Sequence, residues 1–193
     1  MSETPVVIDN FLPTEMFFNF AHTSMTGMHY RPCDFTESHE ESDGSIDTFG
    51  ENLATQKNFH ESMCQALHYA RTHHFQQVSD FYLNSFDTIQ EIKKLLNIKQ
   101  LWRLRTNCTF GQKEKHLGSF HVDTPDRGFH TPENKTAILY LNTNNGGTQF
   151  ENSIFVESKA NRCVVAPMTM RHAGVWTTNA KLRYVTNINY TEN

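Results

Sequence analysis

The sequence predicts an α+β fold in which helices come first and a β sandwich or barrel follows. Before residue 100, apolar side chains recur at spacings of three and four, which is the helical period. After Gln100, short alternating segments are separated by turn residues, a pattern typical of sandwiches and barrels. The length fits one domain, residues 1–193, in which residues 1–100 are mainly a helical support and residues 101–193 form the β core.

The beginning of the chain contains two short elements and one long irregular stretch. Residues 6–12 start as an apolar strand and run into a turn. A helix is predicted from Pro13 to about Gly27, because proline is tolerated in the first turn and glycine commonly follows a helix end. Residues 31–58 show no regular period, and we expect their polar, acidic segment 37–47 to be a candidate lid.

Two more helices are predicted before the β half begins. Apolar residues from Met63 to Tyr82 recur at helical spacing, so residues 61–82 are expected to form one helix. Ile89, Ile92 and Leu96 belong to the apolar stripe of a second helix over residues 87–96.

The second half contains seven predicted strands. The hairpin turn at residues 144–147, Asn-Asn-Gly-Gly, is the clearest of the signals that separate them. The expected strands cover residues 102–110, 120–123, 136–141, 148–151, 154–156, 162–166 and 182–190.

Composition limits the class of protein. The formal charge is −4 and no basic stretch is interleaved with aromatic residues, so binding to nucleic acid is not expected. The four cysteines form no C-x-x-C pair, which favours reduced thiols in the cytoplasm. There is no signal peptide or long apolar run, so we expect a soluble protein without membrane contact. Composition leaves open whether it is a monomer or a homodimer.

A histidine and a carboxylate form the centre of the predicted site. His121 and Asp123 are two residues apart in an expected strand, so their side chains share one face. With His172, expected in a connection between strands, they complete a 2-His-1-carboxylate set, which binds iron and leaves open positions on the metal. Arg183 follows in the last strand, and its planar guanidinium can bind a carboxylate through two hydrogen bonds.

The order of motifs around these residues resembles a known family, the 2-oxoglutarate/Fe(II)-dependent dioxygenases, and within it the prolyl 4-hydroxylase-like group. The resemblance implies a double-stranded β-helix, or jelly roll, with N-terminal helices packed on one sheet. The matching segments are His121-Val122-Asp123, Thr136-Ala137-Ile138-Leu139-Tyr140-Leu141-Asn142, Gly146-Gly147-Thr148-Gln149-Phe150, Arg162-Cys163-Val164-Val165-Ala166-Pro167, His172 and Leu182-Arg183-Tyr184.

The resemblance also implies roles for single residues. His121, Asp123 and His172 would bind Fe(II), and Arg183 would pair with the distal carboxylate of 2-oxoglutarate (2OG), with Lys181 as a rival on the same strand face. One departure concerns a Tyr-x-x-Gly motif, whose tyrosine contacts the cosubstrate in many relatives. The corresponding residue here is a cysteine, Cys108. Further candidates for the cosubstrate contact are Asn107, Thr109 and Tyr140.

The implied activity is hydroxylation of a C–H bond with 2OG and O₂ as cosubstrates and ascorbate as an additional candidate cofactor. The expected substrate is a protein or peptide side chain such as proline. A small molecule and a nucleic-acid base are alternatives, and the acidic charge disfavours the base. Two different classes stay open: a non-catalytic jelly-roll binding module, because jelly rolls serve many functions, and a bicupin-like metal isomerase, which would not require Arg183.

Overall fold

The structure is a computed structural model that describes residues 4–26, 31–32, 62–71, 74–78, 85–123 and 133–193. The helices are α1 (Thr14–Thr26) and α3 (Phe86–Leu95). The strands are β1 (Val6–Ile8), β2 (Arg31–Pro32), β3 (Ser62–Arg71), β4 (His74–Val78), β5 (Ile98–Phe110), β6 (Asn134–Tyr140), β7 (Gly147–Phe150), β8 (Phe155–Glu157), β9 (Arg162–Pro167), β10 (His172–Val175) and β11 (Leu182–Glu192).

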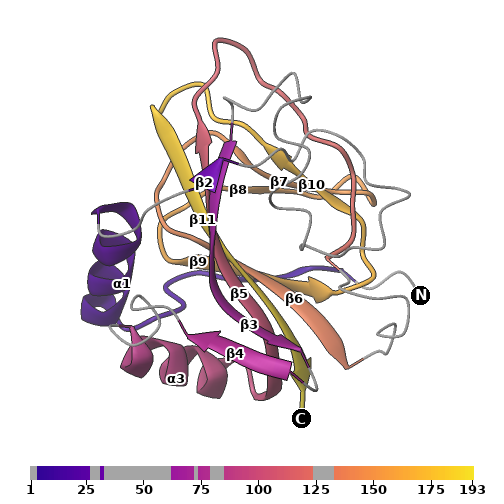
Figure 1. Ribbon diagram of the computed structural model, residues 1–193. Coiled ribbons are helices and arrows are strands. Elements are labelled where there is room, and N and C mark those ends of the chain that lie inside the picture. Colours follow the sequence, from indigo (N-terminus) through magenta and orange to yellow (C-terminus); the bar gives the residue numbers. More distant parts are fainter. Residues whose placement is uncertain (1–3, 27–30, 33–61, 72–73, 79–84, 124–132) are drawn as a thin grey trace.

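The strands form a large and a small antiparallel sheet. The large sheet has the order β1-β9-β6-β11-β5-β3-β2, with β4 paired to β3, and the small sheet has the order β10-β7-β8. Neighbours such as β6 and β11 are far apart in sequence, so the sheet crosses over repeatedly, as in a jelly roll. Figure 1 shows the helices on one side of the large sheet and the small sheet on the other.

Alternation along the central strands gives the large sheet two different faces. On one face, Leu104 of β5 and Ile188 of β11 join a core cluster with Phe20 of α1 and Ile92 of α3. On the other face, Val185 of β11 belongs to a second cluster that includes apolar side chains of β6, β7, β8 and β9. Because side chains on a strand alternate between faces, the positions between the helix-side residues point into the space between the sheets.

The N-terminal segment is tied to strand β9 by backbone and side-chain contacts. β1 pairs with β9, and the amide of Asn161 bonds both the backbone N–H and the C=O of Leu12, at 2.9 and 2.8 Å. At the surface, the carboxylate of Asp9 accepts hydrogen bonds from Arg162 at 2.7 and 3.1 Å and from Lys159 at 3.0 Å. The bonds from Arg162 and then Lys159 hold the pKa of Asp9 well below its usual range.

Most of the predicted elements are present. The helices expected from residue 13 and over residues 87–96 are α1 and α3, and the strand expected at residues 182–190 is β11. The other strands of the second half agree within a few residues, with one exception at residues 120–123, described below.

The prediction of a helix over residues 61–82 is wrong. Ser62–Arg71 is strand β3 and His74–Val78 is strand β4, and β3 pairs with β5 along seven residue pairs. The physical reason is tertiary pairing. β5 would otherwise present an unpaired edge, and the backbone hydrogen bonds between β3 and β5 stabilise the strand more than the helical spacing of apolar residues stabilises a helix. Among the described residues of the first 100, strands β1 to β4 thus accompany the helices α1 and α3, so this part is not a purely helical support. The predicted irregular segment, residues 31–58, lies outside the described residues except for β2.

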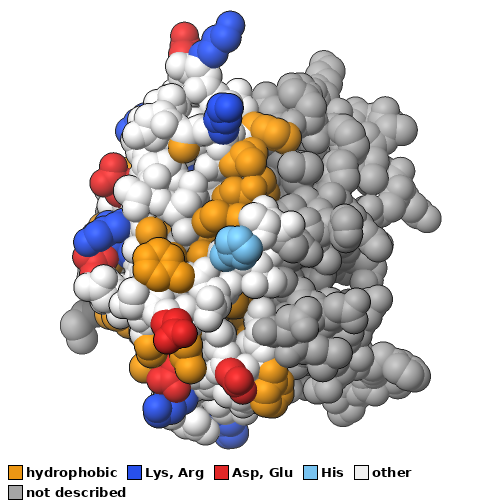
Figure 2. Space-filling view, turned by 90° about the vertical axis from the view of Figure 1, so that its left-hand side faces the viewer, with side chains coloured by type: hydrophobic (Ala, Val, Ile, Leu, Met, Phe, Trp, Pro, Cys, Tyr) orange, Lys and Arg blue, Asp and Glu red, His pale blue; other side chains and the backbone are white. Residues whose placement is uncertain are grey.

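The helix side of the molecule is mixed in character. Figure 2 shows apolar, acidic and basic side chains interspersed over this face, and no charge sign prevails on its described part. Phe18, Phe86 and Leu95 are exposed there. The described part of this face therefore shows no basic patch of the kind that binds nucleic acid. Neither described helix is long and apolar enough to span a membrane.

Candidate functional site

The three predicted metal ligands converge between the sheets, although the backbone around them differs from expectation. His121 forms an isolated bridge with His172, closed by two reciprocal N–H···O=C bonds of 2.9 Å, and the expected strand at residues 120–123 is absent. His172 is the first residue of β10, where a connection was predicted. The bridge places the two imidazoles side by side, with ring centroids 4.8 Å apart.

Hydrogen bonds fix the orientation of both imidazoles. Nδ1 of His121 lies 3.1 Å from the carbonyl oxygen of Ser119, and Nδ1 of His172 lies 3.1 Å from that of Met170. A carbonyl oxygen only accepts, so each Nδ1 is the donor, and Nε2 of each ring is the nitrogen left to bind a metal. These Nε2 atoms lie 3.7 and 3.8 Å from the Asp123 carboxylate oxygens, and one ligand atom from each of the three residues lies within 4.8 Å of the others.

This donor set fits a divalent metal ion. Nε2 of His172 is buried and has no hydrogen-bond partner among the described residues, which is costly unless a ligand occupies the space. Desolvation, followed by the neighbouring His172, lowers the pKa of His121 to about 4, so the ring is neutral near pH 7 and can donate its lone pair. Two imidazoles and one carboxylate on one side of an ion form the facial set of non-haem Fe(II) sites.

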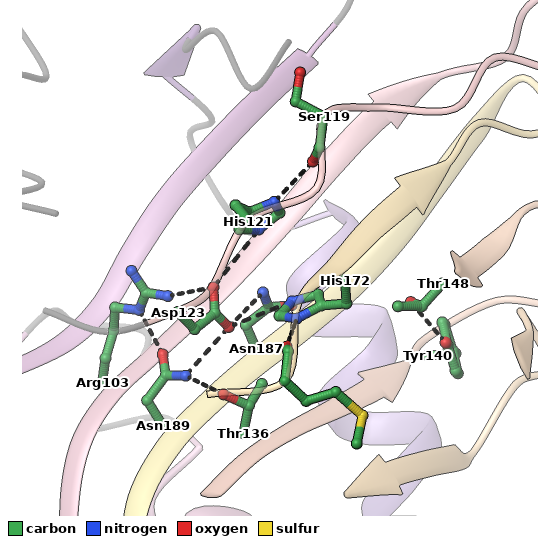
Figure 3. A network of polar contacts seen from close by, with 11 residues as sticks. Arg103, Ser119, His121, Asp123, Thr136, Tyr140, Thr148, His172, Asn187 and Asn189 are labelled. Carbon is green, nitrogen blue, oxygen red and sulfur yellow. Dashed lines mark hydrogen bonds and ion pairs between the residues drawn. The ribbon is translucent and has the colours of Figure 1, made fainter. Parts of the chain in front are cut away.

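The carboxylate of Asp123 is held by residues that the sequence analysis missed (Figure 3). Nη2 of Arg103 lies 3.2 Å from Oδ1, and the side-chain amides of Asn189 and Asn187 lie 3.2 and 3.5 Å from Oδ2. Burial alone would raise the pKa of Asp123, but Arg103 and the two histidines hold it well below its usual range. The available signal was the run of polar residues at alternate positions, Arg103, Arg105, Asn107 and Thr109 of β5 and Asn187 and Asn189 of β11, which indicates a largely polar interior face.

Arg183 lies on the same face of β11 and is almost fully buried, with 5% of its surface exposed. Nη2 donates to the carbonyl oxygen of Gly147 at 2.8 Å, and the guanidinium lies 5.8 Å from the ring centre of Tyr140. No described carboxylate forms an ion pair with Arg183, and its Nε has no hydrogen-bond partner among the described residues. A buried cation without an anion is costly, so this geometry indicates a site for a carboxylate ligand.

The other predicted cosubstrate residues, Asn107, Thr109 and Tyr140, lie on strands β5 and β6. Thr109 lies opposite Arg183 in the β5–β11 register, and its Oγ1 is buried without a partner among the described residues, as is Oδ1 of Asn107. Tyr140 is buried nearby, and its hydroxyl donates to Thr148 at 2.8 Å. Of these residues, Tyr140 lies beside the guanidinium of Arg183, Thr109 lies opposite Arg183, and Asn107 lies opposite Val185.

The rival candidate Lys181 and the motif residue Cys108 both lie away from this pocket. Lys181 is exposed on a bend before β11 begins, so it does not share a strand face with Arg183. Cys108 packs in the helix-side cluster on the opposite face of β5. It therefore cannot take the place of the tyrosine, because neighbouring residues on a strand point to opposite faces.

Gly174 leaves room beside the predicted metal ligands. It lies two residues after His172 on β10 and opposite Thr148 of β7, whose hydroxyl meets Tyr140 between the sheets. A side chain at this position would therefore point inward. A Cβ built on Gly174 would find no atom within 4 Å. Open space thus lies between the sheets, on the face that carries His172.

Comparison with solved structures shows which proteins share this architecture. A 2OG-Fe(II) oxygenase family oxidoreductase from Burkholderia pseudomallei matches 98% of this chain and 86% of its own, with a TM-score of 0.63 and 9% identity. The non-haem alpha-ketoglutarate-dependent epimerase SnoN of nogalamycin biosynthesis matches 97% and 77%, with a TM-score of 0.59 and 13% identity. A prolyl hydroxylase from Trichoplax adhaerens, in complex with a hypoxia inducible factor peptide fragment, matches 97% and 83%, with a TM-score of 0.56 and 14% identity.

These identities are low and establish a common fold. No family model and no curated protein matches the chain by sequence. The resemblance inferred from the motifs is confirmed at the level of fold: the antiparallel sheets have the arrangement found in 2OG-Fe(II) oxygenases, prolyl hydroxylases among them.

Proposed function

We propose that the protein is an Fe(II)- and 2OG-dependent oxygenase that hydroxylates a C–H bond. The observation that carries this proposal is the pairing of two features between the sheets. One is the His121, Asp123 and His172 donor set, and the other is Arg183, a buried cation with no described carboxylate partner. Neither a non-catalytic binding module nor a simple metal isomerase requires both features.

Each part of the chain has a definite task in this proposal. His121, Asp123 and His172 hold Fe(II), which together with 2OG and O₂ supplies oxidative decarboxylation coupled to hydroxylation. Arg183 binds the distal carboxylate of 2OG through the N–H groups that Gly147 does not use, and Thr109, which is opposite Arg183 in the register, donates its hydroxyl proton to the same carboxylate. The apolar cluster that includes Phe150 and Val185 keeps water from the space between the sheets.

For the substrate, we propose a protein or peptide side chain such as proline. Support comes from the fold shared with a prolyl hydroxylase that was solved with a peptide, which is an argument by analogy. SnoN has the same fold and was solved with nogalamycin RO, so a small-molecule substrate is the second candidate. Screening proline-containing peptides and small molecules for 2OG consumption separates the two classes.

The test of the proposed function is an anaerobic titration of the protein with Fe(II) and 2OG, followed by visible absorption. We expect a charge-transfer band that needs both components, because a 2-oxo acid chelated to Fe(II) absorbs in the visible whereas either component alone does not. The band should disappear in His172→Ala. A well-folded wild-type protein that gives no band would contradict the proposal and favour the binding module.

The open space at Gly174 provides a second, independent prediction. We expect Gly174→Val to weaken 2OG binding by at least about 10-fold, because the added isopropyl group would occupy room that the ligand needs. Fe(II) binding without 2OG should stay at the wild-type level, since no metal ligand changes. Isothermal titration with each component measures both, and unchanged 2OG affinity would show that the ligand does not reach Gly174.

A further inference from the structure

Asp123 is one corner of a closed ring of two hydrogen bonds and one ion pair, which joins β5 and β11 to the segment carrying the metal ligands. Nη2 of Arg103 meets Oδ1 of Asp123 at 3.2 Å, and Nε of Arg103 donates to Oδ1 of Asn189 at 2.7 Å. Nδ2 of Asn189 closes the ring by donating to Oδ2 of Asp123 at 3.2 Å, and it also donates to Oγ1 of Thr136 at 2.9 Å. Figure 3 shows this ring directly beside the two imidazoles.

Strand register brings Arg103, Asn189 and Thr136 together. Arg103 of β5 lies opposite Asn189 of β11, and Asn189 lies opposite Thr136 of β6. Opposed residues in an antiparallel pair share a face, so the three side chains form a row across the sheet. The row is buried, because Asn189 and Thr136 are 1% and 2% exposed and the side chain of Arg103 is 12% exposed.

The ring restricts how the carboxylate can turn. Each oxygen of Asp123 receives its own donor, Oδ1 from Arg103 and Oδ2 from Asn189, so rotation about the Cβ–Cγ bond would break both contacts. In the observed orientation Oδ1 faces His121 at 3.7 Å and Oδ2 faces His172 at 3.8 Å. Oδ1, which faces Arg103, has a second lone pair to offer toward the imidazoles, whereas Oδ2 accepts from Asn189 at 3.2 Å and from Asn187 at the longer distance of 3.5 Å.

We infer that Arg103 and Asn189 are positioning residues, which act as one unit to hold the Asp123 carboxylate in the orientation that binds the metal. The inference rests on the proposed function, because it concerns the same metal site. Partners of this kind around metal ligands change metal affinity by about 10- to 100-fold when they are removed. Sequence motifs give no indication of this role, since both residues lie outside the segments that resemble the dioxygenases.

The test measures Co²⁺ binding by the metal-free protein, using the visible absorption of bound Co²⁺ for both affinity and coordination. We expect Asn189→Leu, which changes no charge and little volume, to weaken Co²⁺ binding by about 10- to 100-fold and to alter the spectrum. Arg103→Met should weaken binding to a similar degree. The double variant should be little weaker than the worse single variant, because residues that act as a unit are non-additive.

An effect of Arg103 through its charge and an effect through positioning would change Co²⁺ affinity in opposite directions when Arg103 is replaced by methionine. If the guanidinium acted only through its positive charge, its removal would reduce repulsion of the dication, and Arg103→Met would bind Co²⁺ more tightly. Arg103→Lys keeps the charge but cannot reach both acceptors with a planar fork. We therefore expect the lysine variant to lose affinity, and full rescue by lysine would overturn the inference.

The matched control is Arg162→Met, because Arg162 forms a similar two-bond pair with Asp9 at the surface. It should leave Co²⁺ affinity unchanged. If Asn189→Leu has a lowered melting temperature but wild-type Co²⁺ affinity, the ring has only a structural role and the inference is wrong. If the wild-type protein binds no divalent metal, the proposed function fails, and this inference fails with it. Should Arg103→Met not fold, Asn189→Leu and Arg103→Lys still decide the question.

Discussion

Asp123→Ala is expected to abolish Fe(II) binding and all turnover of 2OG. The variant loses the anionic ligand, and it also leaves the buried guanidinium of Arg103 without its carboxylate, so a positive charge faces the metal position. Anaerobic Fe(II) titration measures the first effect, and succinate production measures the second. His121→Ala and His172→Ala should be equally inactive, because each removes one of the three donors.

The control for this prediction is Asp9→Ala, which removes a carboxylate that is also held by an arginine. Asp9 binds Arg162 and Lys159 at the surface near β1, so its loss should leave iron binding and turnover unchanged. Residual turnover near the wild-type level in Asp123→Ala would exclude this residue as a metal ligand. Loss of activity in both variants would instead point to general destabilisation.

Arg183→Met is expected to raise the KM for 2OG by about 100-fold or more, because it removes a charged two-bond contact to the distal carboxylate. Metal binding without 2OG should be unaffected. The same variant should raise the melting temperature of the ligand-free protein, because methionine takes the place of a buried cation that has no described carboxylate partner. Steady-state kinetics and thermal unfolding test these opposite effects.

Lys181→Met provides the comparison, because it also removes one positive charge near the start of β11. Lys181 is exposed, and we expect its replacement to change KM by less than about threefold, as for a screened surface charge. A larger rise in KM for Lys181→Met than for Arg183→Met would reverse the assignment. An unchanged KM in both variants would show that the cosubstrate is bound elsewhere.

The parts of the fold that were predictable are those where local signals and tertiary packing agree. Helix α1 has an early proline before it and an apolar stripe, and β11 has side chains that alternate between two environments. Strand β3 was not predictable, because its apolar residues have helical spacing and its identity depends on pairing with β5, a partner more than 30 residues later. Local periodicity carries no information about such a partner.

In the candidate site, some residues could be predicted from the sequence and others could not. The two histidines, Asp123 and Arg183 could be proposed because their types and order suit iron and a 2-oxo acid. The residues around them could not, since Arg103 and Asn189 meet Asp123 only through the register of β5 and β11. Cys108 occupies the sequence position of the motif tyrosine, and one step of strand alternation places it in the helix-side core, away from the site.

Strand β11 carries residues at both ends of the proposed site. Arg183 near its start is the proposed anchor of the cosubstrate tail, and Asn189 near its end donates to the carboxylate of Asp123, six residues and about 20 Å along one extended backbone. The register shift of the strand falls between Asn189 and Tyr190, just beyond the last of these residues, so alternation is unbroken where it matters. The separation of these two side chains is therefore fixed by the backbone of a single strand, which loop movements leave unchanged.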